Sequence, residues 1–143
     1  MADPAPIEIV TFKPWEDPIL DQFDLSPTCY YSRLAWLPIL GPASWVMLGS
    51  ISLHLQHLPS VTWRISDLGR DHGLGSPARP NHITVRTLSR LERFGLIRFE
   101  LPAMALARTK MPPLSAAQLR RAPRHMQLVH RQMMREDQQQ RGA

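Results

Sequence analysis

The sequence predicts an α+β fold that is mainly α-helical, with a small β-hairpin and an additional C-terminal helix. An apolar period typical of a helix begins at Ala43, and a second begins near Asn81. Two short strand-like segments, 97–101 and 104–108, directly follow the second helix. With 143 residues, 43% of them hydrophobic, the chain is long enough to bury one core, and we expect one domain with tails.

The first of these helices carries its apolar residues at intervals of three, three and four, so that they fall on one face. These residues are Trp45, Leu48, Ile51 and Leu55. Pro59 cannot continue a helix and ends it. Residues 61–65 alternate as a short strand, and a short helix over about 66–72, capped by Ser66 or Asp67, should follow. A turn rich in glycine and proline then leads to the second long helix.

The N-terminal part differs in composition from this centre. Residues 1–28 are rich in proline and aspartate and should form an acidic arm, in which residues 7–12 have the composition of an added edge strand. Segment 29–42 is strongly apolar and should pack on the domain as a short helix or an extended clamp. It is the lead-in to a domain that we expect over 29–110.

The C-terminal part should be a helical extension over 111–137. A short helix is expected over 115–121 and a second over 123–137, with a disordered tail over 138–143. The second helix has a narrow apolar stripe made of Met126, Val129 and Met133. A stripe of this kind either folds back on the core or forms a homodimer, and the sequence leaves both open.

The helix predicted over 81–94 has two faces of different chemistry. Asn81 is a suitable N-cap, and Gly95 stands where a helix commonly ends. At 100° per residue the core face consists of Ile83, Thr87, Leu88, Leu91 and Phe94. The opposite face is a polar stripe of His82, Arg86, Ser89 and Arg93. A charged outer face can be simply solvated, so the stripe alone does not assign a function.

The segment RTLSRLERFGLIRFE (86–100) resembles the recognition helix and first wing strand of many bacterial winged-helix transcriptional regulators. In those families a Leu-x-x-Leu spacing, a charged surface residue, Gly-Leu-Ile and a wing strand follow one another. The matching residues here are Leu88, Leu91, Glu92, Gly95, Leu96 and Ile97. With the order helix, strand, short helix, turn, helix and hairpin, the resemblance implies a winged helix-turn-helix over about 43–109. A second segment, 36–48, is similar to the start of the N-terminal winged helix of Gram-positive primosomal replication proteins.

The resemblance implies a non-enzymatic DNA-binding protein, a transcriptional regulator that docks helix 81–94 in the major groove of double-stranded DNA. A recognition helix sends side chains to base edges and phosphates, and arginine is the commonest reader of guanine. The candidate contacts are Arg79, His82, Arg86, Ser89, Arg93, Arg108 and Lys110. Of these, Arg79, Arg108 and Lys110 are expected on phosphates. The alternative is a winged-helix adaptor that binds a protein partner in a replication or plasmid/phage maintenance complex.

The charge distribution agrees with a polyanionic partner. Residues 1–40 hold six acidic residues against Lys13 and Arg33, a local charge of −4. The remainder holds 15 basic residues against six acidic ones, a charge of +9. We therefore expect residues 41–143 to face nucleic acid and the first forty not to. The predicted wing tip, Pro102 and Ala103, carries no charge, so deep reading of the minor groove by the tip is not expected.

No pattern in the sequence predicts an enzyme, a metal or a cofactor. His54 and His57 have a helical spacing that can share a metal ion, but a zinc site needs a third ligand and none is marked. The glycines of 73–75 lack the Lys-Ser/Thr of a phosphate loop. Cys29 is the single cysteine and should be a small buried hydrophobe.

The sequence also predicts a cytoplasmic protein without a membrane span. Acidic residues stand near the N-terminus, where a secretory signal would place lysine or arginine before an apolar run. The longest stretch without charged residues, 34–63, is interrupted by proline and glycine, whereas a spanning helix needs about 20 mostly apolar residues.

Overall fold

The computed structural model describes residues 8–75 and 82–142. Within them lies one sheet of four strands in the order β2-β1-β4-β3. The strands are β1 (Ile9–Pro14), β2 (Val61–Arg64), β3 (Ile97–Leu101) and β4 (Met104–Ala107). β1 pairs antiparallel with β2 and parallel with β4, and β3 and β4 form the expected hairpin. The predicted α+β class is therefore confirmed, with a mixed sheet.

Strand β1 corrects the prediction for the N-terminal part. It is an interior strand between β2 and β4, neither an added edge strand nor part of an arm. The side chains of Val10 and Phe12 are fully buried, whereas Ile9 is 47% exposed on the other face, as the alternation of a strand requires. Asp17 then caps α1 (Pro18–Asp21) with its side chain, and Leu25 is buried. Residues 9–25 are thus part of the folded domain.

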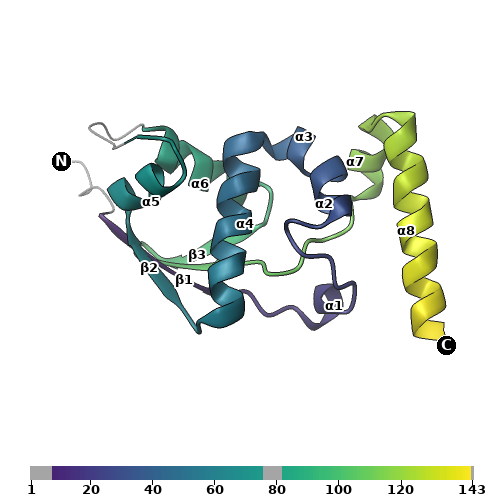
Figure 1. Cartoon of the computed structure of the whole chain (residues 1–143), viewed down its shortest axis with the longest axis horizontal. Helices are drawn as coiled ribbons and strands as arrows, with labels where there is room; N and C mark the ends of the chain where they lie inside the picture. The colour runs from purple at the N-terminus through teal and green to yellow at the C-terminus, as the bar shows by residue number, and fades with distance from the viewer. Residues whose placement is uncertain (1–7, 76–81, 143) are drawn as a thin grey trace.

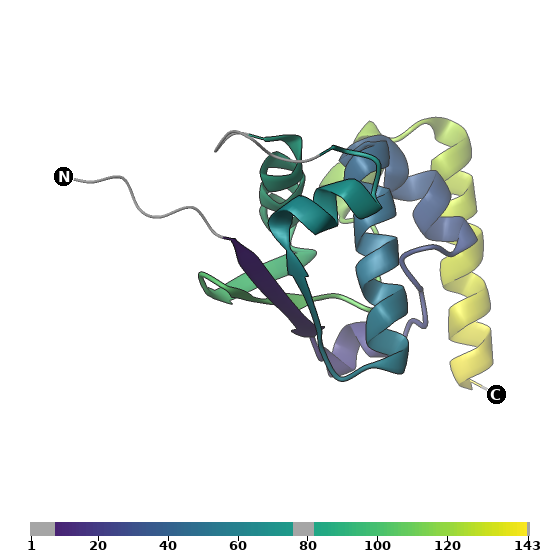
Figure 2. The same cartoon turned by 60° about the vertical axis from the view of Figure 1, so that its left-hand side comes forward.

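The helices of the predicted centre lie within a few residues of their expected positions. They are α4 (Pro42–His57), α5 (Ile65–Asp71) and α6 (Ile83–Arg93). Figures 1 and 2 show these three helices on one side of the sheet. The short helix α5 starts directly after β2 and has no side-chain cap, so the predicted caps Ser66 and Asp67 are wrong. From α4 to β4 the observed order is the predicted one.

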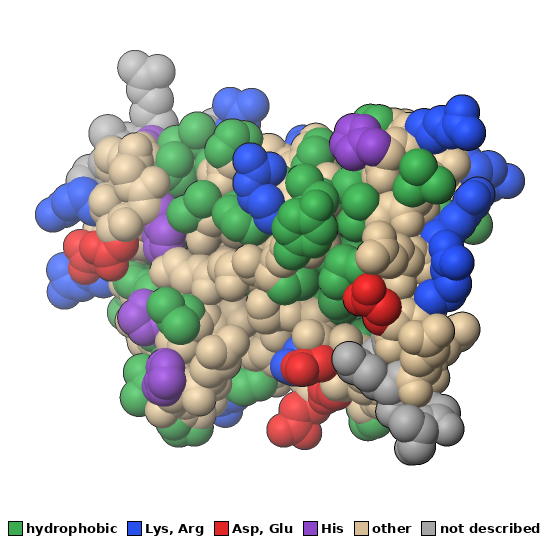
Figure 3. Space-filling view, turned by 45° about the vertical axis from the view of Figure 1, so that its right-hand side comes forward, with side chains coloured by type: hydrophobic (Ala, Val, Ile, Leu, Met, Phe, Trp, Pro, Cys, Tyr) green, Lys and Arg blue, Asp and Glu red, His purple; other side chains and the backbone are tan. Residues whose placement is uncertain are grey.

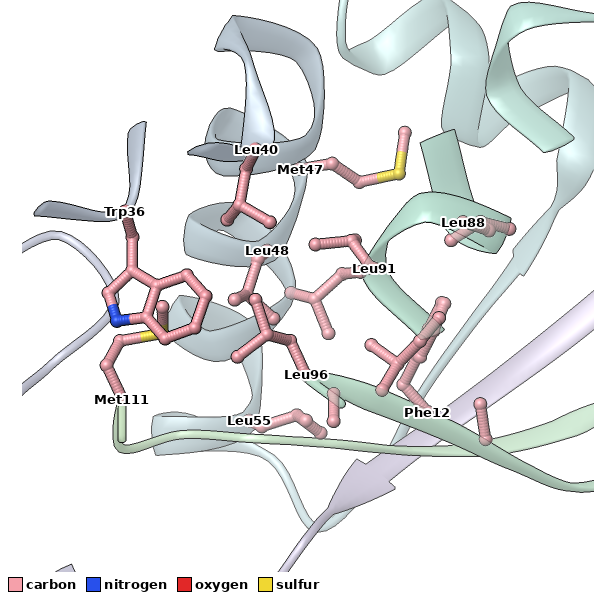
Figure 4. Close-up of a cluster of buried hydrophobic side chains, with 14 of the residues drawn as sticks. Phe12, Trp36, Leu40, Met47, Leu48, Leu55, Leu88, Leu91, Leu96 and Met111 are labelled. Carbon is pink, nitrogen blue, oxygen red and sulfur yellow. The ribbon is translucent and has the colours of Figure 1, made fainter. Parts of the chain in front are cut away.

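The core lies between α4, α6 and the sheet. Leu48 of α4, Leu91 of α6 and Leu96 are all fully buried and face one another in Figure 4. Phe12 of β1 and Trp36 close the two ends of this cluster. The outer face of α6 is therefore set by which of its residues enter this core.

The apolar lead-in forms two short helices, α2 (Tyr30–Ala35) and α3 (Leu37–Leu40). Of the two forms left open for 29–42, the helical one is observed. Tyr31 and Trp36 are buried, and the Trp36 Nε1 donates to the carbonyl of Pro112 at 2.9 Å. The lead-in therefore joins the C-terminal part to the domain.

The C-terminal part consists of α7 (Ala116–Arg121) and α8 (Arg124–Gly142), as Figure 1 shows along one side of the molecule. Ser115 and Gln118 form a capping box at the start of α7. The expected disordered tail is wrong for 138–142, because α8 continues through these residues.

The apolar stripe of α8 turns toward the chain's own core. Met126 is 3% exposed, Met133 is partly buried against the core, and α8 packs on α2. Val129, the third residue of the predicted stripe, is also partly buried. Of the two uses left open for the stripe, packing on the chain's own core is the one observed, and the homodimer stays a prediction.

Candidate nucleic-acid interface

Helix α6 presents a polar face opposite its buried one. Its buried residues are Thr84, Thr87, Leu88 and Leu91. Arg86, Ser89 and Arg93 are exposed, and at 100° per residue they lie within an arc of about 60°. Gly95 follows with a φ of +72°, the left-handed conformation that glycine adopts without strain. Three residues of the predicted stripe therefore share one solvent-facing strip.

His82, the fourth residue of the predicted stripe, has a structural role. It is the N-cap of α6, and its Nδ1 accepts a hydrogen bond from the backbone amide of Thr84 at 3.2 Å. The predicted cap, Asn81, and the predicted phosphate ligand, Arg79, lie outside the described residues.

Helices α5 and α6 approach each other closely at Gly69. A Cβ atom at this position would lie 2.4 Å from the Oγ1 of Thr84 and 2.6 Å from the carbonyl oxygen of Gly75. Only glycine permits this distance, so the start of α6 is held against α5. Gly69 was not among the residues predicted from the sequence, although an isolated glycine in a helical pattern signals close packing.

The C-terminal end of α6 is fixed by Arg90, which is charged but structural. Its Nε and Nη2 donate to the carbonyls of Leu40 and Ile39 at 2.8 and 2.7 Å, where α3 ends. Its guanidinium also lies over the ring of Phe94, at 5.5 Å. A helix end that is anchored in this way presents its exposed strip with little freedom to rotate.

The hairpin is attached to α6 by Glu92. Its Oε2 accepts a hydrogen bond from the backbone amide of Phe99 in β3 at 3.0 Å. The charges of the hairpin are paired with each other, because Arg98 contacts Glu100 at 2.7 Å and lies over Trp15 at 4.8 Å. The turn between β3 and β4 is uncharged, as the sequence predicts.

Arg108 is held by the N-terminal segment and does not face solvent. Its side chain is 14% exposed, and its Nη1 pairs with the Oδ2 of Asp17 at 3.1 Å. Its Nε donates to the carbonyl of Gly95, and its guanidinium lies 3.8 Å from the ring centre of Trp15. The backbone amide of Leu20, and to a lesser degree Arg108, lower the pKa of Asp17.

Lys110 forms an ion pair with Asp24, which is 85% exposed, so this pair lies at the surface. The two cations that were expected on phosphates thus bind acidic residues of the first forty. Acidic residues of the N-terminal segment therefore pair with part of the chain's positive charge. Arg108 and Lys110 are not part of the exposed strip of α6.

The described residues thus define an α+β protein with an anchored helix that presents arginines to solvent. Comparison with family models, with curated proteins and with solved structures finds no match.

Residues 8–75 and 82–142 contain neither a metal-binding cluster nor a membrane-spanning helix. No group of three or more His, Cys, Asp or Glu side chains there is placed to hold a metal ion. His54 instead packs edge-on against Trp63, with ring centres 5.1 Å apart. No helix in these ranges has the length and apolar character that crossing a bilayer requires.

Proposed function

We propose that the chain is a non-enzymatic DNA-binding protein, a transcriptional regulator that docks α6 in the major groove of double-stranded DNA. In this assignment, α4 to β4 form a winged helix-turn-helix, and α5 and α6 are the two helices that flank its turn. One observation carries it: Arg86, Ser89 and Arg93 are exposed together on a helix that packs closely on α5 at its start and is held by Arg90 at its end.

The spacing of these residues suits a major groove. Arg86 and Arg93 are seven residues apart, which is about 10.5 Å along the helix axis at 1.5 Å per residue. A major groove is about 12 Å wide and admits an α-helix, so both guanidinium groups can reach one stretch of it. Ser89 lies between them and suits either a base edge or a phosphate.

The anchoring of α6 favours recognition because a fixed helix loses little freedom on binding. β1 was expected as an added edge strand, but it lies between β2 and the hairpin. The wing therefore has a further strand beside it. With paired charges and an uncharged turn, the wing offers few phosphate contacts. The proposal therefore assigns specific contacts to α6 and none to the wing tip.

The test is fluorescence polarisation with duplex DNA, on the wild type, Arg86→Gln and Arg93→Gln. Loss of one phosphate contact should flatten the slope of log affinity against log salt by about 0.9 and weaken all sequences equally. Loss of a bidentate guanine contact should instead cost about 1–3 kcal/mol on the preferred sequence only.

The matched control for this test is Arg98→Gln, which removes the same charge from a guanidinium already paired with Glu100. It should change binding little. If Arg86→Gln and Arg93→Gln bind as well as the control and remain folded, α6 is not the recognition element.

The alternative function, a protein-binding adaptor, is favoured by a groove of about 460 Å³ between α2, α3, the end of α6, α7 and the start of α8. Its lining is mostly apolar, including Leu34, Ile39 and Phe94, with Arg121 and His125 as its charged or titratable members. These properties suit an apolar segment of a partner that carries carboxylates. If the chain does not bind duplex DNA even at low salt, this alternative is favoured.

A further inference from the structure

A second basic surface lies on the C-terminal helices, away from the exposed strip of α6. Five arginines of α7 and α8 are exposed: Arg120, Arg121, Arg124, Arg131 and Arg135. Figure 3 shows lysine and arginine side chains gathered along the side of the molecule that α7 and α8 occupy.

These arginines differ from Arg98, Arg108 and Lys110 in forming no ion pair with a described side chain. Arg98, Arg108 and Lys110 each contact a carboxylate. Among the side chains that the structure describes, none of the five arginines of α7 and α8 forms an ion pair. Glu136, a described carboxylate of α8, instead accepts a hydrogen bond from Gln132 at 3.3 Å. Glu136 is the one carboxylate among the described side chains of α7 and α8, so this surface keeps a clear excess of positive charge.

Three of the five arginines form a line along α8. Arg124, Arg131 and Arg135 are separated by seven and four residues, which places them within about 40° of one another at 100° per residue. They span about 16 Å along the axis. Since one strand of duplex DNA carries a phosphate about every 3.4 Å of axis, this line covers about five phosphates.

The position of α8 is fixed by contacts on its opposite side. The hydroxyl of Tyr31, itself fully buried, lies 2.7 Å from the Nδ1 of His130 and accepts a hydrogen bond from the amide of Leu114 at 2.8 Å. Met126 of the same helix is also part of the core. Because the apolar side is occupied within the chain, the arginine line must face outward.

We propose that the outer face of α8, with Arg124, Arg131 and Arg135, is a second nucleic-acid contact that binds the phosphate backbone without reading sequence. The planar guanidinium fork binds phosphate oxygens in pairs and is weakly hydrated, which favours arginine over lysine on such a surface. This contact does not require α6 to bind DNA, since α8 packs on α2 and α7.

An anionic membrane is the competing polyanion, and the arrangement of α8 argues against it. A helix that lies in a membrane interface inserts an apolar face between the lipids. The apolar side of α8 is buried against the protein, and Leu128, which is 53% exposed, is the large apolar residue on the basic side. A nucleic-acid backbone needs no such insertion, so it fits this face better.

The test compares two triple variants of the full chain on two unrelated 24-base-pair duplexes, from about 50 to 200 mM salt. The first, Arg124→Gln/Arg131→Gln/Arg135→Gln, removes the charges and keeps residues of good helix propensity. Its salt slope should flatten by up to about 2.7, at about 0.9 for each lost contact, with equal loss of affinity on both duplexes. The second, with lysine at the same three positions, should keep most of the slope.

Failure of this inference is distinguishable from failure of the proposed function by testing Arg86→Gln/Arg93→Gln alongside. If this α6 variant binds like the wild type while the α8 glutamine variant loses affinity, the α8 contact stands and the α6 proposal fails. If the α8 glutamine variant keeps the wild-type slope and affinity, with an unchanged thermal melt, the inference is overturned. It is also overturned if phosphatidylserine vesicles, and not DNA, bind through these arginines.

Discussion

Replacing Gly69 with alanine tests whether the close approach of α5 and α6 positions α6, the helix that we propose docks in DNA. The added methyl group would meet two atoms at distances that real Cβ atoms do not adopt, 2.4 Å to the Oγ1 of Thr84 and 2.6 Å to the carbonyl oxygen of Gly75. The second of these atoms is backbone and cannot rotate away. The helices must therefore separate, or α5 must shift.

Two opposing effects set the size of the change. Alanine in a helix is favoured over glycine by up to about 1 kcal/mol. Forcing extra volume into a packed contact costs about 1–3 kcal/mol. We expect a net destabilisation of roughly 0.5–2 kcal/mol, which lowers the melting temperature by about 2–8 °C in a chain of this size. Because α6 is displaced, DNA affinity should fall as well.

Thermal melts and a double-mutant cycle with Thr84→Ala make the test quantitative. Thr84→Ala removes the Oγ1 atom, so the double variant should recover part of the loss but not the part caused by the backbone of Gly75. A coupling energy of about 0.5 kcal/mol or more is expected for groups in direct contact. If Gly69→Ala instead raises the melting temperature, the two helices can move apart at little cost. The claim that only glycine fits at this contact is then refuted.

Three further predictions concern the contacts that hold the ends of the chain. Tyr31→Phe removes a buried hydroxyl and leaves the amide of Leu114 without its partner, so it should destabilise the fold by about 1–3 kcal/mol in denaturant titrations; an unchanged midpoint would contradict this. Burial, and then Arg131, lower the pKa of His130 from 6.5. The neutral ring should therefore stabilise the fold above pH 6.5, and this contribution should be lost as the pH falls through the lower pKa of the folded state. The melting temperatures of the wild type and His130→Gln should converge at acid pH. Arg108→Gln should destabilise the chain yet leave the salt dependence of DNA binding unchanged; a flatter slope would return this residue to the interface.

The elements that the sequence predicted well are those whose determinants are local. The period, the stop at Gly95 and the following hairpin all lie within one short segment, so α6 was placed to within two residues. The capping box at Ser115 is equally local, and α7 begins where it predicts. Local propensity and turn chemistry were sufficient in both cases.

The features that the sequence missed depend on partners far away in the chain. β1 pairs with residues about 50 and 90 positions later, and its acidic neighbours suggested an arm. Arg108 was expected on a phosphate, but its partner Asp17 is 91 residues away. The apolar stripe of α8 was recognised, whereas its packing on α2 depends on tertiary contacts that no local pattern contains.

The hydrogen bond from Phe99 to Glu92 has a consequence for how the protein behaves at high concentration. β3 is an edge strand, and the unpaired amides of an edge strand can template pairing with another chain. The carboxylate of Glu92 occupies one of these amides from the side on which a foreign strand would add. Removing this carboxylate with Glu92→Leu leaves the amide open, so the residue that ties the hairpin to α6 also protects the sheet from self-association.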